Sequence, residues 1–248
     1  MTQEKTIRRT GTRLWLAAWL AALSVVPAVA GAASTITGTI TFTGKPPAPR
    51  PIAMDADPAC AKKHSTPAMN EMLILGNGST MGNVMVYISK GLPSGKTFPV
   101  PKAPAVLDQN GCQYRPHVMG IMVGQQYKIL NSDGILHNVH ALPKINPGFN
   151  KPMPATVKET TASFAKAEPV FQIKCDVHPW MNAYVGVFTH PFFTVTGADG
   201  KFTISGLDPG TYEVTAWHER LGTQTATITV GASDTKTQNF KFAAPAAK

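Results

Sequence analysis

Apolar and polar residues alternate along many short stretches of this 248-residue chain. Between residues 34 and 43, Ile36, Ile40 and Phe42 alternate with threonines, which is typical of a strand with one buried face. Similar runs recur at 83–88, 126–131, 182–188 and 212–217, with Gly, Pro or Asn turns between them. No stretch supports a helix of three turns. The pattern predicts an all-β protein built from two β-sandwiches.

Turn-rich segments divide the chain into parts. Residues 91–104 are rich in Gly, Pro and Lys and favour a boundary, so we expect an N-terminal β segment at 34–104. A second unit follows at 105–190, in which 143–168 is expected to be loop-rich, with Pro147, Pro152 and Pro154 breaking any helix. The last part, 191–248, is a regular series of strands and turns.

The first 33 residues resemble a secretory leader and are set apart from the fold. Arg8, Arg9 and Arg13 precede an apolar run from Leu14 to Val29, and small residues allow cleavage after Ala30 or near Ala33. The apolar run is short for a bilayer span, so an uncleaved anchor is the weaker alternative. We therefore expect a periplasmic or secreted protein with no stable membrane anchor after cleavage.

Cleavage of this leader changes the charge of the protein. It removes four basic residues and one acidic residue, so the formal net charge of +9 falls to about +6. A basic surface of this size favours acidic partners. It does not indicate nucleic-acid binding, because no dense run of Lys and Arg carries interleaved aromatic residues.

The three cysteines are an odd number for an oxidising compartment. Cys60 and Cys112 both lie in turn-like surroundings, so we predict that they form a disulfide. Cys175 then remains as a thiolate, and a bound metal ion would protect it from oxidation.

Cys175 also begins the stretch with the clearest chemistry. Cys175, His178 and Met181 are spaced three residues apart on a tight loop after a strand, and they offer a thiolate, an imidazole and a thioether. These donors suit an ion that alternates between Cu(I) and Cu(II). One more imidazole would complete the set, from His137 or His140. We favour His137, because it stands at the end of a loop.

Residues 105–190 resemble the cupredoxins, the blue-copper proteins, and most closely amicyanin and plastocyanin. The resemblance rests on Asn131 to His140 and on the Cys-x-x-His-x-x-Met loop. It implies a Greek-key sandwich with one copper ion on His137, Cys175, His178 and Met181, and a hydrogen bond from Asn138 to the cysteine loop. Amicyanin has Thr-Pro where this chain has Asp176-Val177, so the resemblance does not predict the reduction potential of the copper site.

The C-terminal part resembles the carboxypeptidase regulatory-like domain, a small transthyretin-like sandwich that is usually non-catalytic. The resemblance rests on the turn-rich stretches 196–202 and 206–212. Residues 38–44 and 84–88 look like first strands of the same domain type, so the copper unit is hypothesised to be inserted into it. His117 is expected to be structural, and His218-Glu219 a satisfied surface pair.

These observations predict a non-enzymatic type 1 copper protein that carries electrons between exported redox proteins with acidic docking surfaces. Electrons would pass through an exposed edge of His178, beside Pro179 and Trp180. A copper storage or delivery module would use the same ligands without turnover. A metal-free scaffold or carbohydrate-associated sandwich protein is the third alternative.

Overall fold

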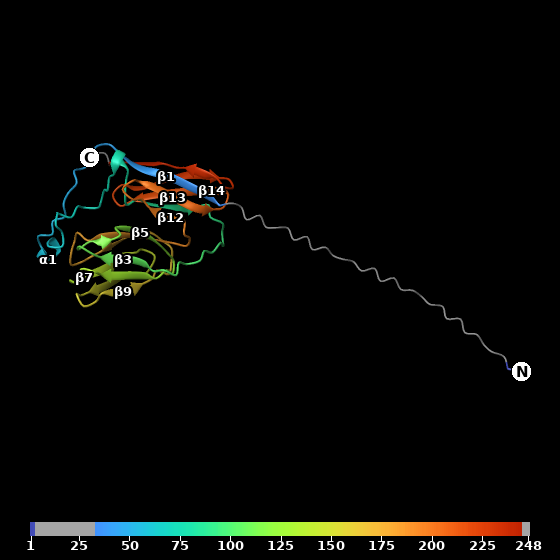
Figure 1. The fold of residues 1–248 in the computed structure, drawn as a ribbon, viewed down its shortest axis with the longest axis horizontal. Helices are drawn as coiled ribbons and strands as arrows, with labels where there is room; N and C mark the ends of the chain where they lie inside the picture. The colour runs from blue at the N-terminus through green and yellow to red at the C-terminus, as the bar shows by residue number, and fades with distance from the viewer. Residues whose placement is uncertain (3–32, 245–248) are drawn as a thin grey trace. The chain divides into compact units, whose positions relative to one another are not determined.

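The computed structural model describes residues 1–2 and 33–244, which are mostly strands and turns (Figure 1). The helices among them are α1 (Pro58–Ala61) and the 3₁₀ turn η1 (Asn77–Ser79). The prediction of an all-β fold is confirmed. Nearly all of the predicted leader lies outside the described residues. None of the described helices has the length and apolar character that crossing a membrane requires.

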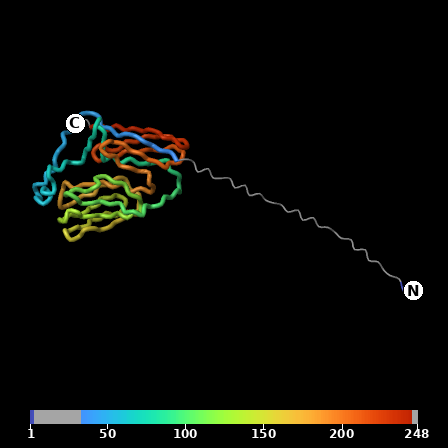
Figure 2. Tube along the Cα trace, in the orientation of Figure 1, coloured from blue at the N-terminus to red at the C-terminus, as the bar shows by residue number. Residues whose placement is uncertain are grey.

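One sandwich, here called the outer sandwich, combines strands from the beginning and the end of the described chain (Figure 2). Its first sheet contains β13 (Lys201–Leu207), β1 (Ser34–Thr43), β16 (Thr235–Thr237) and β17 (Phe240–Ala243). Its second sheet has the order β12 (Phe193–Val195), β2 (Met85–Lys90), β14 (Gly210–His218) and β15 (Gly222–Val230). Apolar side chains of both sheets share one core.

The alternation in β1 explains its central place in the first sheet. Every second residue from Ser34 to Phe42 is buried, and Ile36 and Ile40 are fully buried. Successive side chains of a strand point to opposite faces, so this alternation buries one face of β1. Ile36 pairs antiparallel with Ile204, and Ile40 pairs parallel with Phe240. β1 therefore joins strands that lie far apart in sequence.

The inner sandwich is formed entirely by strands between residues 105 and 188. Its five-stranded sheet has the order β5 (Val118–Met122), β11 (Asn182–Phe188), β10 (Glu168–Lys174), β7 (His137–Ala141) and β8 (Phe149–Met153). Its four-stranded sheet has the order β4 (Tyr114–Arg115), β3 (Ala105–Gln109), β6 (Tyr127–Asn131) and β9 (Glu159–Ala162). Leu107, Ile129, Ile173 and Val185 belong to the core between the sheets.

Residues 143–168 are loop-rich as expected, and they also contain the strands β8 and β9, which were not predicted. Proline lacks the N–H that a central strand needs, so it argues against a strand assignment. Pro152 is accommodated because β8 is the edge strand of its sheet, where it pairs with Asn138 of β7. Because it contains a proline, the edge strand β8 was not predicted from the sequence.

The two sandwiches contact each other through a small apolar cluster and a buried polar pair. Met85 of β2, Val118 of β5 and Phe188 of β11 form the cluster. At Gly120 of β5, a Cβ atom would lie 2.4 Å from the Phe193 ring, so only glycine allows this close approach. The polar pair joins His117 Nε2 and Glu219 Oε1 at 2.5 Å, and both side chains are less than 10% exposed.

A buried carboxylate holds the loop that follows β7. Glu168, 3% exposed, accepts hydrogen bonds from the backbone N–H groups of Lys144, Ile145 and Asn146 and from the Asn146 side chain. Burial alone would raise the pKa of Glu168, but these donors outweigh it and lower the pKa. The charged form is therefore the one that stabilises the fold.

We expect Glu168→Gln to lower the free energy of unfolding by about 2 kcal/mol at pH 7, because hydrogen bonds to a charged group are lost. A lowered folded pKa gives stability that is present above the unfolded value of about 4.5 and lost as the pH falls through the folded pKa. The difference from wild type should therefore shrink toward pH 3. Denaturant titrations at both pH values measure it, with the exposed Glu159→Gln as the control. An equal difference at pH 3 and pH 7 would contradict this assignment.

Candidate metal centre

The loop from Cys175 to Met181 connects β10 to β11 and closes on itself. Cys175 follows the last residue of β10, and its N–H donates to the Met181 carbonyl at 3.1 Å. The Met181 N–H in turn donates to the His178 carbonyl at 2.9 Å. These bonds turn the chain so tightly that the side chains of Cys175 and His178 meet in the interior.

Three of the predicted ligands come together at this loop. His137 begins β7, the neighbour of β10, and its Nδ1 lies 2.9 Å from His178 Nδ1. Cys175 Sγ lies 3.8 Å from the same His178 nitrogen. One donor atom from each residue falls within 4.8 Å of the others, and none of the three residues is more than 2% exposed. A thiolate and two imidazoles therefore face one buried point.

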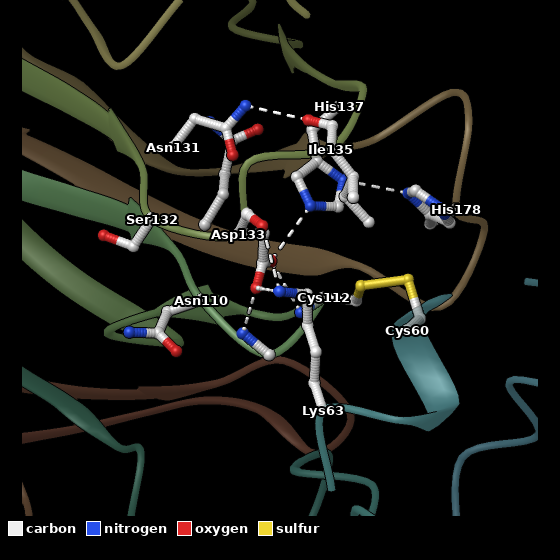
Figure 3. Close-up of polar contacts among 12 residues, drawn as sticks. Cys60, Lys63, Asn110, Cys112, Asn131, Ser132, Asp133, Ile135, His137 and His178 are labelled. Atoms are coloured by element: carbon white, nitrogen blue, oxygen red, sulfur yellow. Dashed lines mark hydrogen bonds and ion pairs between the residues drawn. A yellow bond between two sulfur atoms is a disulfide. The ribbon is translucent and has the colours of Figure 1, made fainter. Parts of the chain in front are cut away.

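The outer nitrogen of each histidine meets a carboxylate, and Figure 3 shows the contact between His137 and Asp133. His137 Nε2 lies 3.0 Å from Asp133 Oδ2, and His178 Nε2 lies 2.9 Å from Asp57 Oδ2. A carboxylate partner favours the proton on Nε2, which leaves the Nδ1 lone pair for a metal ion. The two facing Nδ1 atoms thus fit the role of ligands.

Asp133 is held in place from several sides. Its carboxylate accepts hydrogen bonds from the backbone N–H groups of Gly111 and Cys112, at 2.7 and 2.8 Å, and it pairs with Lys63 at 3.2 Å. Burial would raise the pKa of Asp133, but His137 and these donors lower it to about 2. Asp133 is therefore an anion that fixes the orientation of His137.

The Cys175 thiol is prepared for metal binding in a similar way. Burial would raise its pKa, but hydrogen bonds from His137, Asn138 and His178 outweigh burial and lower the pKa to about 7. A thiol with this pKa is substantially ionised at neutral pH, and the thiolate is the form that binds metals. The donor set is therefore chemically ready for a soft or borderline cation.

Asn138 connects β7 to the cysteine loop. Its Oδ1 accepts the Asp176 N–H at 2.7 Å and lies 3.3 Å from Cys175 Sγ, and its Nδ2 donates to Asp176 Oδ2 at 3.0 Å. Tyr114 Oη donates to the Asn138 carbonyl. Asn138 thereby holds the cysteine loop beside β7, in the position that the resemblance implied.

Met181 and His140 are the other two residues considered as ligands, and they lie in different surroundings. Met181 is 1% exposed and belongs to the same core cluster as Cys175, while its role as an axial ligand stays a prediction. His140 lies outside the donor cluster. Its side chain is 31% exposed and pairs with Asp176 at 3.0 Å. The structure thus groups His137, and not His140, with Cys175 and His178.

The expected exposed edge of His178 is wrong. His178 is 2% exposed, because Asp57 covers its Nε2 and the Trp180 ring lies 5.1 Å from its own. Asp57 precedes α1, and the Cys60–Cys112 disulfide, with an S–S distance of 2.03 Å, ties this helix to the inner sandwich. The segment around α1 therefore covers the edge of His178 that was expected to be exposed.

The expectation of a surface pair at His218-Glu219 is also wrong. His218 is 1% exposed, and the Glu219 side chain is 5% exposed because it pairs with His117 of the inner sandwich. Strand β14 ends at the contact between the two sandwiches, so its last residues become buried there. His117 is 9% exposed and contacts Glu219 and the Asn182 carbonyl, while its structural role stays a prediction.

Sequence reasoning missed the two carboxylates. Asp133 had a usable signal, because it precedes His137 by four residues in a loop that leads into β7. Asp57 had none, because 121 positions separate it from His178 and the intervening chain gives no sign of the contact.

Comparison with known proteins gives different information for the two sandwiches. The family model of the carboxypeptidase regulatory-like domain matches residues 178–243, so this part of the chain is similar to that domain. The match includes β11, which pairs within the inner sandwich, as well as the outer strands that follow. The search of curated proteins found no match.

Solved structures similar to the chain include three copper proteins, all of low similarity. A copper-containing nitrite reductase from Thermus scotoductus SA-01 has 19% identity and a TM-score of 0.32, over 40% of this chain and 25% of its own. A reduced mutant of amicyanin has 23% identity and a TM-score of 0.31, over 41% and 97%. A purple cupredoxin from Nitrosopumilus maritimus has 23% identity and a TM-score of 0.29, over 34% and 98%. The chain thus spans about a quarter of the nitrite reductase.

Proposed function

We propose that the inner sandwich binds one copper ion per chain as a type 1 centre, and that the protein carries single electrons and catalyses no reaction of its own. The observation that carries this proposal is the buried cluster of Cys175 Sγ with the Nδ1 atoms of His137 and His178. A bound copper ion supplies the Cu(I)/Cu(II) couple. A thiolate, two imidazoles and a weak thioether are the donors of blue-copper sites, and Cys175, His137, His178 and Met181 would supply them here.

The surroundings of the donors support electron transfer over substrate chemistry. Asp133, Asp57 and Asn138 hold the two imidazoles and the cysteine loop through hydrogen bonds of 2.7 to 3.0 Å. Rigid donors limit the rearrangement that accompanies a change in oxidation state. Because the three donors are at most 2% exposed, the site offers no evident room for a substrate.

The proposed location is the periplasm or the extracellular space, with exported redox proteins as partners. A disulfide at Cys60–Cys112 is typical of an oxidising compartment. A formal net charge of about +6 without the leader favours partners with acidic docking surfaces. Since Asp57 covers His178, we place electron exchange away from the Nε2 edge of this residue.

Titration of the metal-free protein with Cu(II) tests the proposal. We expect an end point at one equivalent, an intense visible band and the narrow hyperfine splitting of a type 1 site in paramagnetic resonance. Reversible one-electron voltammetry then separates a carrier from a copper store, which would bind the ion without a reversible wave. Absence of stoichiometric copper uptake would rule out both and favour a metal-free scaffold.

A further inference from the structure

The segment that covers His178 is a loop closed at its base. Residues 51 and 69 pair in an isolated bridge, and the Ile52 N–H donates to the Ala68 carbonyl at 2.7 Å. Among the described residues, this bridge is the only β pairing that residues 51–69 make. We call these residues the flap. The bridge joins the two ends of the flap to each other, and a segment without strand pairing to a sheet has few backbone bonds to break when it moves.

The tip of the flap contacts the metal centre and its supports. Asp57 meets His178 Nε2, and Lys63 pairs with Asp133, the partner of His137. His64 Nε2 lies 2.7 Å from the Gly111 carbonyl. The only covalent link is the Cys60–Cys112 disulfide, which Figure 3 shows beside both histidines. Every one of these contacts thus holds the tip over the ligands.

The base of the flap packs against the inner core through the partly buried side chains of Ile52 and Ala68. Beside it lies a cavity of about 290 Å³, whose lining includes Ile52 of the flap and Pro179, Trp180 and Met181 of the cysteine loop. The polar contacts at the tip are partly solvated, because the side chains of Asp57 and Lys63 are 32% and 28% exposed. Partly exposed ion pairs contribute little to stability. Met54 and Cys60 are buried in the inner core and also hold the flap, and the disulfide adds a covalent restraint at the tip.

We propose that the flap controls access to the metal centre and that the Cys60–Cys112 disulfide is its latch. With the disulfide formed, dissolved reagents reach Cys175 slowly. A metal ion bound there also exchanges slowly with solvent. Both latch cysteines are fully buried, so dissolved reductants reach the bond only slowly. Metal entry is accordingly fast before this disulfide forms and slow afterwards. This inference concerns the regulation of the site. Only its statement about metal entry and exchange rests on the proposed function.

Alkylation of Cys175 in the metal-free protein tests the flap without any metal. In a Cys60→Ala/Cys112→Ala variant, Cys175 is the sole thiol, as in the wild type with its disulfide intact. We expect iodoacetamide to alkylate Cys175 at least about tenfold faster in this variant, because the flap opens without global unfolding. Circular dichroism and the denaturation midpoint establish that the variant is folded. Equal alkylation rates in a folded variant would overturn the proposal.

A second variant tests the latch if the first does not fold. Asp57→Asn/Lys63→Met removes the two ion pairs of the tip and keeps the disulfide. The flap should then stay closed, with the alkylation rate within about threefold of wild type, since exposed pairs contribute little. An increase of about tenfold or more would mean that polar contacts close the site, and it would overturn the role of the disulfide as the latch.

Transfer of Cu(I) to excess bathocuproine disulfonate extends the test to the metal. We expect faster transfer from the disulfide-free variant than from wild type, with the copper stoichiometry unchanged. Equal transfer rates from two copper-loaded proteins would overturn the flap as a barrier and leave the proposed function standing. If wild type takes up no copper, the proposed function fails, and the alkylation rates still decide whether the flap closes the site.

Discussion

A Cys175→Ser variant is expected to lose the intense visible absorption of the Cu(II) protein, by more than about tenfold, because this band needs a copper–thiolate bond. Cys175 Sγ is the only free thiol among the described residues, and it lies within 4.8 Å of both histidine donors. A serine hydroxyl in its place is a neutral oxygen that stays protonated near neutral pH. Copper held by the two remaining imidazoles would give weak absorption and a wide hyperfine splitting.

The matched control is the Cys60→Ala/Cys112→Ala variant, which removes two sulfur atoms and keeps Cys175. It should retain the visible band at one equivalent of copper. Visible absorption spectra and paramagnetic resonance of both variants, recorded at equal copper loading, compare their copper sites. An intense band that persists in Cys175→Ser would show that the copper–thiolate assignment is wrong.

Substitution of His137 is expected to have the second largest effect. His137→Gln should weaken copper binding by more than about 100-fold, because loss of even an outer partner of a ligand costs 10- to 100-fold. His137 is fully buried, with Nδ1 2.9 Å from His178 Nδ1. Glutamine has a similar size and no imidazole nitrogen. Competition against a chelator of known copper affinity measures the loss.

His140→Gln is the control from the same strand. The His140 side chain is 31% exposed and pairs with Asp176 outside the donor cluster. Its substitution should change the copper affinity by no more than about threefold, because exposed pairs contribute little. A larger loss in His140→Gln than in His137→Gln would exchange the roles of these two residues. Unfolding curves of both metal-free variants separate ligand loss from loss of the Asp133–His137 contact.

Local patterns predicted those parts of the fold and the site that depend on neighbouring residues. The alternation at 34–43 predicted β1, and the spacing of Cys175 and His178 predicted two donors that the structure brings together. β8 was missed because Pro152 argues against a strand, and the sequence does not say which strand lies at the edge of a sheet.

Contacts between distant segments could not be predicted. A single aspartate in a loop is common, so nothing marked Asp57 as the residue that covers His178. The same limit applies to Glu219, whose burial depends on His117 in another sandwich. The prediction that an edge of His178 is exposed was wrong for this reason. The predicted ligands lie on adjacent strands and one loop, whereas their covering comes from a remote part of the chain.

The pairing of β1 has a consequence for the order in which this protein assembles. All strand partners of the inner sandwich lie between residues 105 and 188, so this sandwich is complete when only part of the chain is available. β1 precedes it in the chain, yet its partners β13, β16 and β17 come after it. A chain delivered from its N-terminus therefore holds β1 without a strand partner until β13 arrives, and one of its edges stays open until β16 and β17 follow. Unpaired edges join readily to other chains. The interval before β13 arrives is thus the stage at which newly delivered chains are most exposed to aggregation.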